Sequence, residues 1–284
     1  MHKLIHQEIL IEDKAYHKPL TADITYFQNH EPKAIIIFAH GFKGFKEWGP
    51  WPNLANQVAV EGFCFCKLNF SYNGTTPEIL DDITDLEAFG HNNFSKELED
   101  LDRLIDFLLI PNREFSKEID PNRLFLIGHS RGGGISIIKA AEDPRIKKVA
   151  TWASVHDFAS RFSEAELAYW KAEGVVYAKN SRTGANYPMY YQFVEDFINN
   201  GDRFIISNAV KRLNQPMLII HGTKDETVNV QSAFQLQQWN AQATLFLLED
   251  ANHTFGGKHP FNEDELPSDL KKALLKTISF FKTE

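Results

Sequence analysis

The sequence LFLIGHSRGGG, residues 124–134, places a serine between two different patterns of apolar residues. The run 124–127 is typical of a buried strand, and residues 132–141 continue with the pattern of a helix. Ser130 therefore stands at a tight strand-to-helix turn, with Gly128 before it and Gly132 after it. Such a turn holds the serine in a strained backbone conformation that exposes its hydroxyl, and a Cβ at either glycine would collide with the neighbouring chain.

Two later segments supply partners for this serine. A serine hydroxyl is a weak nucleophile, so it needs a base and an acid that orients the base. The segment IIHGTKD, 219–225, puts Asp225 just after an apolar run, and ANHTF, 251–255, puts His253 just after the next one. We therefore predict Ser130 as the nucleophile, His253 as the base and Asp225 as the acid. The rival candidates are His259 for the base, which we expect at the surface, and Glu226 or Asp250 for the acid.

A glycine-containing loop follows the apolar run 34–39 and reads HGFKG, 40–44. Attack on a carbonyl creates an oxyanion, which two preorganised backbone N–H groups usually stabilise. The amide after the nucleophile, that of Arg131, is the first predicted donor, and the amide of Phe42 in this loop is the second. We expect His40 to organise the loop through hydrogen bonds.

The rest of the chain alternates short apolar runs with amphipathic stretches, as in a mainly parallel sheet covered by helices. The first two strands are predicted to pair antiparallel across a turn at 12–14. The helix at 94–109 carries five acidic residues, which we interpret as a solvated face. The predicted strands are 4–11, 20–27, 34–39, 63–68, 124–127, 148–155, 217–220 and 244–248, and the predicted helices are 51–60, 94–109, 132–141, 231–239 and 267–281.

Residues 157–210 break this alternation. A capping box at Ser163 predicts a helix that Gly174 ends, followed by a hairpin over 175–187 and a helix over 190–198. Aromatic residues make up 11 of these 54 residues, against 13% of the whole chain. We predict a cap inserted into a core formed by residues 1–156 and 211–284. Its aromatic residues form either a small core of their own or the lining of a pocket for an apolar or aromatic substrate.

Composition narrows the functional classes. A chain of 284 residues with 43% apolar residues can bury a core, and its net charge of −8 argues against nucleic acid or an anionic membrane as a partner. The two cysteines, Cys64 and Cys66, lie too close on one predicted strand for a disulfide and are expected to be buried thiols. The first 18 residues lack a signal-peptide pattern and no membrane-spanning run occurs, so we expect a cytoplasmic protein. No metal-ligand spacing or phosphate loop is present, so no cofactor is predicted; the oligomeric state stays open.

Taken together, the HGFKG, GHSRG, IHGTKDETV and ANHTF motifs resemble the α/β-hydrolase superfamily over nearly the whole chain. They are most similar to bacterial acyl esterases of the feruloyl and cinnamoyl type, and also to dienelactone hydrolases and prolyl-oligopeptidase-like peptidases. The resemblance implies an eight-stranded sheet with the cap between its sixth and seventh strands, and it implies the same triad and oxyanion donors. Two features depart from the relatives: residues 69–74 read NFSYNG, and the nucleophile is serine where dienelactone hydrolases use cysteine.

The sequence thus predicts a serine hydrolase that cleaves small carboxylic esters through an acyl-enzyme. A peptidase, amidase or acyltransferase on the same fold is the main alternative. A ligand-binding protein without catalysis is a more remote one.

Overall fold

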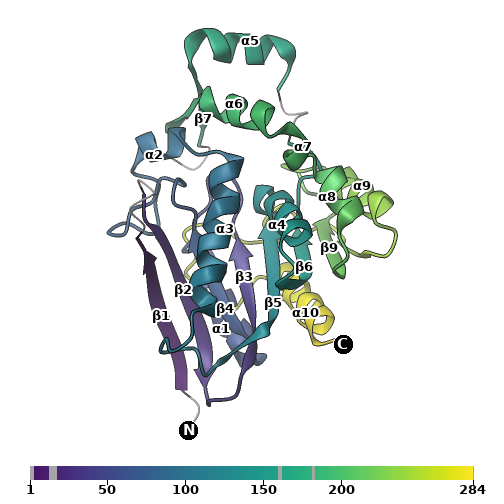
Figure 1. The fold of residues 1–284 in the computed structure, drawn as a ribbon. Coiled ribbons are helices and arrows are strands. Elements are labelled where there is room, and N and C mark those ends of the chain that lie inside the picture. Colours follow the sequence, from purple (N-terminus) through teal and green to yellow (C-terminus); the bar gives the residue numbers. More distant parts are fainter. Residues whose placement is uncertain (1–2, 13–17, 159–161, 181–182, 284) are drawn as a thin grey trace.

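The computed structural model describes residues 3–12, 18–158, 162–180 and 183–283. Its centre is an eight-stranded sheet in the order β1-β2-β4-β3-β5-β6-β9-β10 (Figure 1). Strand β2 pairs antiparallel with both of its neighbours, and the pairs from β4 to β10 are parallel. The predicted fold class, an α/β-hydrolase sheet of eight strands, is confirmed.

The strands of this sheet have the following bounds: β1 (Lys3–Ile11), β2 (Leu20–Gln28), β3 (Lys33–Ala39), β4 (Cys64–Asn69), β5 (Ile119–His129), β6 (Ile146–Trp152), β9 (Met217–Gly222) and β10 (Thr244–Leu248). A separate two-stranded hairpin consists of β7 (Val175–Lys179) and β8 (Asn186–Tyr190). The helices are α1 (Trp51–Val60), α2 (Leu86–Gly90), α3 (Phe94–Leu109), α4 (Arg131–Glu142), α5 (Glu164–Glu173), α6 (Gln192–Asn199), α7 (Gly201–Phe204), α8 (Ile206–Arg212), α9 (Gln231–Trp239) and α10 (Ser268–Lys282).

Both faces of the sheet are buried, because its strands carry apolar side chains on each side. In β3, Ile35 and Ile37 belong to one hydrophobic cluster and Ile36 and Phe38 to another. Helices α3, α4 and α9 contribute buried residues to the first cluster, and α1 and α10 to the second. The near-continuous apolar run of β3 is therefore typical of a parallel strand at the centre of a three-layer fold.

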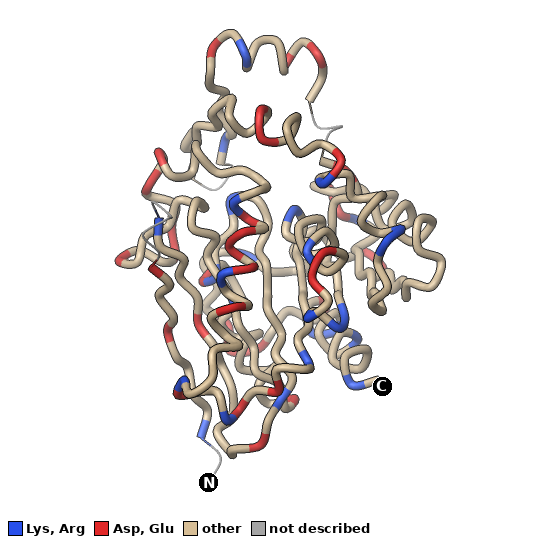
Figure 2. The backbone as a smooth tube through the Cα atoms, viewed as in Figure 1, with Lys and Arg blue, Asp and Glu red and all other residues tan. Residues whose placement is uncertain are grey.

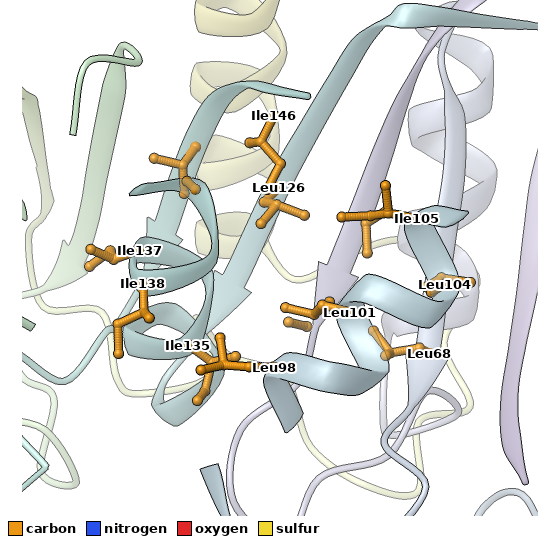
Figure 3. Close-up of a cluster of buried hydrophobic side chains, with 14 of the residues drawn as sticks. Leu68, Leu98, Leu101, Leu104, Ile105, Leu126, Ile135, Ile137, Ile138 and Ile146 are labelled. Atoms are coloured by element: carbon orange, nitrogen blue, oxygen red, sulfur yellow. The ribbon is translucent and has the colours of Figure 1, made fainter. Parts of the chain in front are cut away.

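The core under α3 and α4 illustrates how the helices are attached (Figure 3). Leu98, Leu101 and Ile105 recur at helical spacing along α3 and are fully buried. They belong to one cluster with Leu126 of β5 and the isoleucines of α4, and Leu98 lies beside Ile135 (Figure 3). Each fully buried leucine or isoleucine contributes about 1.5–3 kcal/mol of transfer free energy, so this contact fixes the start of α4 firmly against the sheet.

Between β6 and β9 the chain contains α5, the β7–β8 hairpin, α6, α7 and α8, and α8 runs two residues past the predicted cap boundary at 210. The Ser163 capping box is present, and Gly174 ends α5 with a left-handed backbone. The predicted hairpin and the helix after it are also confirmed. In Figure 1, α5 and α6 lie at one end of the molecule, beyond the sheet. We refer to residues 157–210 as the cap segment.

Several elements differ from the sequence prediction. Helix α2 lies between the predicted strand 63–68 and the predicted helix 94–109, where no helix was predicted, and α7 and α8 extend the helical part of the cap segment. These helices have only four to seven residues, too few for a periodic apolar pattern to appear. The predicted turn at 12–14 lies largely outside the described residues.

The prediction that the acidic residues of α3 form a solvated face is wrong in part. Several acidic residues do follow this helix (Figure 2), but Glu97 and Asp100 are buried. Asp100 accepts hydrogen bonds from the Ser71 amide and hydroxyl at 2.7 and 2.8 Å and pairs with Arg103 at 2.9 Å. Burial nevertheless raises the pKa of Asp100 to about 6. Glu97 pairs with Arg131. These partners compensate two carboxylates that the sequence pattern alone assigns to solvent.

Two further expectations concern cysteines and membranes. Cys64 and Cys66 are buried free thiols on β4, as predicted. Within the described part of the chain, every helix is too short or too polar to cross a bilayer.

Replacing Thr277 by valine tests the packing of α10 on the sheet. The buried Thr277 hydroxyl accepts a hydrogen bond from Trp152 Nε1 at 3.0 Å, so valine leaves a buried indole N–H without its acceptor. We expect Thr277→Val to lower the free energy of unfolding by about 1–3 kcal/mol in urea titrations. Thr244→Val, an exposed position on the edge strand β10, should change it by less than about 0.5 kcal/mol. Equal effects of the two substitutions would contradict this assignment.

Candidate active site

Ser130 occupies a strained turn between β5 and α4. Its backbone has φ of 57° and ψ of −120°, a left-handed conformation that non-glycine residues rarely adopt. The Ser130 amide donates to the Trp152 carbonyl at 2.9 Å, and the Ser130 carbonyl accepts from the Gly133 amide at 3.0 Å. Hydrogen bonds from both ends therefore hold the serine in the conformation that the GxSxG pattern predicts.

Close backbone contacts explain the glycines around this serine. A Cβ on Gly128 would lie 2.2 Å from the Gly132 carbonyl oxygen, and one on Gly132 would lie 2.3 Å from the Ala39 carbonyl oxygen. A Cβ on Gly41, in the loop after β3, would lie 2.8 Å from the Ser130 Cβ. The strand-to-helix turn at Ser130 and the loop after β3 thus approach each other so closely that only glycine fits at these positions.

Asp225 is a buried carboxylate with four hydrogen-bond donors around it. Its Oδ1 accepts from the Thr227 and Val228 amides, each at 2.8 Å. Its Oδ2 lies 2.7 Å from His253 Nδ1 and 3.2 Å from His221 Nε2. Burial alone would raise the pKa of this carboxyl, but the hydrogen bonds from His221 and His253 hold it well below its usual range. Asp225 is therefore ionised and can orient the His253 ring with Nδ1 protonated.

His253 lies in the loop after β10, and it lines the same cavity of about 580 Å³ as Ser130. His129 Nε2 contacts the His253 carbonyl oxygen at 2.9 Å, and the two rings lie 4.8 Å apart between centroids. Burial, together with the nearby His253, lowers the pKa of His129 to about 3, so His129 is a neutral donor to that carbonyl. The Ser130 hydroxyl and the His253 ring, both within the described residues, form no hydrogen bond with each other. Catalytic hydrogen bonds are often long before substrate binds.

The two predicted oxyanion donors belong to Arg131, which follows the serine, and to Phe42, which follows Gly41 in the loop that closely approaches the serine. Arg131 is the first residue of α4, where backbone N–H groups have no partner within the helix. Phe42 lies in a turn closed by a 3.0 Å hydrogen bond from the Gly44 amide to the Gly41 carbonyl. His40 fixes this turn, because its Nδ1 contacts the Gly41 carbonyl at 2.8 Å and its Nε2 lies 3.3 Å from Asn73 Nδ2. Burial lowers the pKa of His40 to about 4, so it acts as a neutral loop organiser, as predicted.

A second cavity, of about 260 Å³, adjoins the first, and Phe42 and Ala178 line both. We refer to it as the cap cavity. Its walls come from α3, from the residues after β6 and from the cap segment, and they include Phe94, Val155, Phe158, Val176, Met189 and Phe193. Four aromatic residues of the cap segment, Phe158, Phe162, Tyr177 and Phe193, line this pocket, whereas Trp170 and Phe204 are buried in the hydrophobic core, so each of the two possibilities that the sequence left open is met in part.

Other histidines and acids take different positions. His259, expected at the surface, is half-buried and lines the serine cavity, where its ring packs against Phe45 and its Nδ1 accepts from the Gly49 amide at 2.9 Å. Its polar sequence surroundings gave no sign of this. Asp250 pairs with Lys224 at the surface, and Glu226 is exposed. His156 contacts the Ser232 hydroxyl at 2.9 Å and lines neither cavity.

The contact between His221 and Asp225 was not predicted from the sequence, although their spacing of four residues around a strand end is a usable signal. His221 is fully buried, and its Nε2 also contacts the Val228 carbonyl at 2.8 Å. Across the residues that the structure describes, no group of three or more histidine, cysteine, aspartate or glutamate side chains could hold a metal ion.

Sheet order, elbow and helix layers define a protein of the α/β-hydrolase fold. The sequence model of the BD-FAE family matches residues 84–240, more than half of the chain, and the chain belongs to this family. The matched region includes Ser130 and Asp225 and ends before His253. A search of curated protein sequences gave no match.

Solved structures share this fold at low sequence identity. Est1E from Butyrivibrio proteoclasticus with ferulic acid bound is 15% identical, with 96% of this chain and 97% of that chain covered and a TM-score of 0.68. A dienelactone hydrolase from Anabaena variabilis is 15% identical, with 99% and 98% covered and a TM-score of 0.63. DcsB in complex with its substrate analogue is 14% identical, with 98% and 99% covered and a TM-score of 0.73.

Substituting Gly41 tests the close approach of the loop to the serine. In Gly41→Ala the added methyl must displace the Ser130 side chain, because neither Cβ is at the end of a flexible group. We expect Ser130 to react with a fluorophosphonate probe at least about tenfold more slowly, since small misplacements of a nucleophile are costly. Gly201→Ala, where the Cβ would enter open space, is the control and should react at the wild-type rate. An unchanged labelling rate in Gly41→Ala would contradict the geometry.

Proposed function

We propose that the protein is a serine hydrolase that cleaves carboxylic esters through an acyl-enzyme intermediate. The observation that carries this proposal is the 2.7 Å contact of His253 Nδ1 with the buried Asp225 carboxylate, beside a strained serine in the same cavity. An ionised acid, an oriented imidazole and an exposed hydroxyl are the three groups that nucleophilic acyl transfer requires.

In the proposed first step, the Ser130 oxygen attacks the ester carbonyl carbon while His253 Nε2 takes the hydroxyl proton. The Phe42 and Arg131 amides donate to the oxyanion of the tetrahedral intermediate. The bond to the alcohol oxygen then breaks, and His253 returns its proton to the departing alcohol. Asp225 stays ionised throughout and stabilises the imidazolium.

In the second step, His253 takes a proton from water as the water oxygen attacks the acyl carbonyl. Collapse of that intermediate releases the acid and restores the Ser130 hydroxyl. All of the groups in this cycle come from the chain itself, and the only co-reactant is water.

The cap cavity is the proposed binding site for the acyl group. It adjoins the serine cavity at Phe42, and apolar or aromatic side chains form most of its wall. Its lining favours apolar or aromatic acyl groups. Est1E, which has the same fold, binds ferulic acid, an aromatic acid. This likeness supports the same preference here.

Replacing the nucleophile is the first test. Ser130→Ala should lower kcat for p-nitrophenyl acetate by a factor of the order of 10⁶, to the residual rate that the oxyanion donors and substrate binding still support. Ser207→Ala, on α8 and outside both cavities, is the matched control and should keep wild-type turnover. Wild-type turnover in Ser130→Ala would refute the proposal.

Matched ester and amide substrates separate an esterase from an amidase, and products formed in added alcohol reveal acyl transfer.

Replacing the acid tests its role in orienting the base. Asp225→Asn keeps the shape of the side chain but favours the wrong tautomer of His253, so kcat should fall by about 10⁴. Asp250→Asn, at the exposed rival acid, should change kcat less than about threefold. A loss of less than tenfold in Asp225→Asn would place the acid elsewhere.

Filling the cap cavity tests where the acyl group binds. Val176 on β7 lines this cavity, so Val176→Trp should reduce kcat/KM for p-nitrophenyl benzoate at least about tenfold and that for the acetate much less. Val175→Trp is the control, because this neighbour on the same strand lines neither cavity. Parallel losses for both esters in Val176→Trp would exclude the cap cavity as the acyl site.

A further inference from the structure

The cap cavity has one charged side chain in a wall that is otherwise almost entirely apolar. Arg131 lines the cavity together with phenylalanine, valine, alanine and methionine side chains and Tyr177. Ligand sites of this kind fix the orientation of a bound group through a small number of polar contacts. The Arg131 guanidinium is therefore the natural point of polar recognition for a group that enters the cavity.

The guanidinium is held in place from three sides. Its Nη2 donates to Glu97 Oε1, and its central carbon lies 4.8 Å from the centre of the Phe42 ring and 5.8 Å from that of Phe94. Arg131 is only 7% exposed. A planar cation fixed between a carboxylate and two rings loses little further freedom when it donates to a ligand.

Glu97 neutralises the charge of this arginine. It is 2% exposed, and Asn92 also donates to its Oε1 at 2.8 Å. Burial raises the pKa of Glu97, and the adjacent Arg131 opposes this shift. A carboxylate on the substrate would add an uncompensated negative charge to this buried pair, whereas a neutral acceptor would not.

Arg131 still has donors available for a ligand. A guanidinium carries five N–H groups, and among the described residues Glu97 is the only hydrogen-bond acceptor that it contacts. We propose that Arg131 selects esters whose acyl group is apolar but carries a neutral hydrogen-bond acceptor, such as a ketone oxygen, that reaches the guanidinium in the cap cavity. This inference rests on the proposed esterase function and on the cap cavity as its acyl site.

Two pairs of esters of equal size test the proposal on the whole protein. The p-nitrophenyl esters of 4-oxopentanoic and 4-methylpentanoic acid differ in a ketone oxygen against a methyl group, and those of 5-oxohexanoic and 5-methylhexanoic acid place the same difference one atom further out. Each kcat/KM is divided by the rate at which hydroxide hydrolyses that ester. We expect the wild type to favour the ketone by about tenfold or more in at least one pair, as for a hydrogen bond to a charged donor.

For each variant the result is the ratio of kcat/KM for the ketone ester to that for the methyl ester of the same pair. A ratio is used because the Arg131 amide also belongs to the proposed oxyanion site, so a substitution there can slow both esters. Arg131→Met should bring the ratio to about 1. Since methionine leaves Glu97 buried without its partner, the Arg131→Met/Glu97→Gln double variant is measured as well and should give the same ratio. Glu97→Gln alone keeps the guanidinium and should keep the preference.

A wild-type ratio near 1 in both pairs, or a preference for the ketone that survives in Arg131→Met, would overturn the inference. The mono-p-nitrophenyl ester of glutaric acid carries a carboxylate in place of the ketone. A preference for this ester over both ketone esters would overturn the assignment to a neutral acceptor. Failure of the esterase proposal is distinct, because then no ester is turned over, or turnover persists in Ser130→Ala.

Discussion

The left-handed backbone of Ser130 is the constraint on which the rest of the site depends. A non-glycine residue with φ of 57° and ψ of −120° costs about 1–3 kcal/mol and persists only where its surroundings enforce it. Here β6 and α4 enforce it, because the Ser130 amide donates to the Trp152 carbonyl of β6 and the Ser130 carbonyl accepts from the Gly133 amide of α4. The same strain presents the hydroxyl to the cavity and brings the start of α4 beside it. The large core beneath α4 thus supports a small and unfavourable turn (Figure 3).

Parallel strands explain how residues far apart in sequence meet at this turn. The serine, the acid and the histidine follow β5, β9 and β10, whose carboxyl ends lie at one edge of the sheet. The loop after β3 reaches the same edge, and the cap segment covers part of it. Phe42 and Ala178 line both of the cavities that result, and Arg131 relates the nucleophile to the cap cavity. Its amide adjoins the nucleophile, and its side chain ends in the wall of the cap cavity.

The helices and strands that could be predicted from the sequence are those whose apolar residues recur over many positions, together with the functional residues that follow them. Helix α3 matched its predicted bounds, and so did the strand positions that put Asp225 and His253 after β9 and β10. Contacts across elements could not be predicted in this way. Periodicity shows that Glu97 and Leu98 lie on α3, but not that Arg131, 34 residues further on, compensates the Glu97 charge. Likewise, the polar sequence around His259 concealed its place in the cavity, because the surrounding rings come from the loop after β3.

Trapping the covalent intermediate tests the central claim most directly. Purified protein is mixed with p-nitrophenyl acetate, quenched in acid within milliseconds and digested, and the peptides are identified by mass spectrometry. We expect a transient acetyl group on the Ser130 hydroxyl, which forms with the burst of p-nitrophenol and decays as acetate is released. Ester turnover with Ser130 unmodified at every time point, or with the acetyl group on another residue, would contradict this expectation.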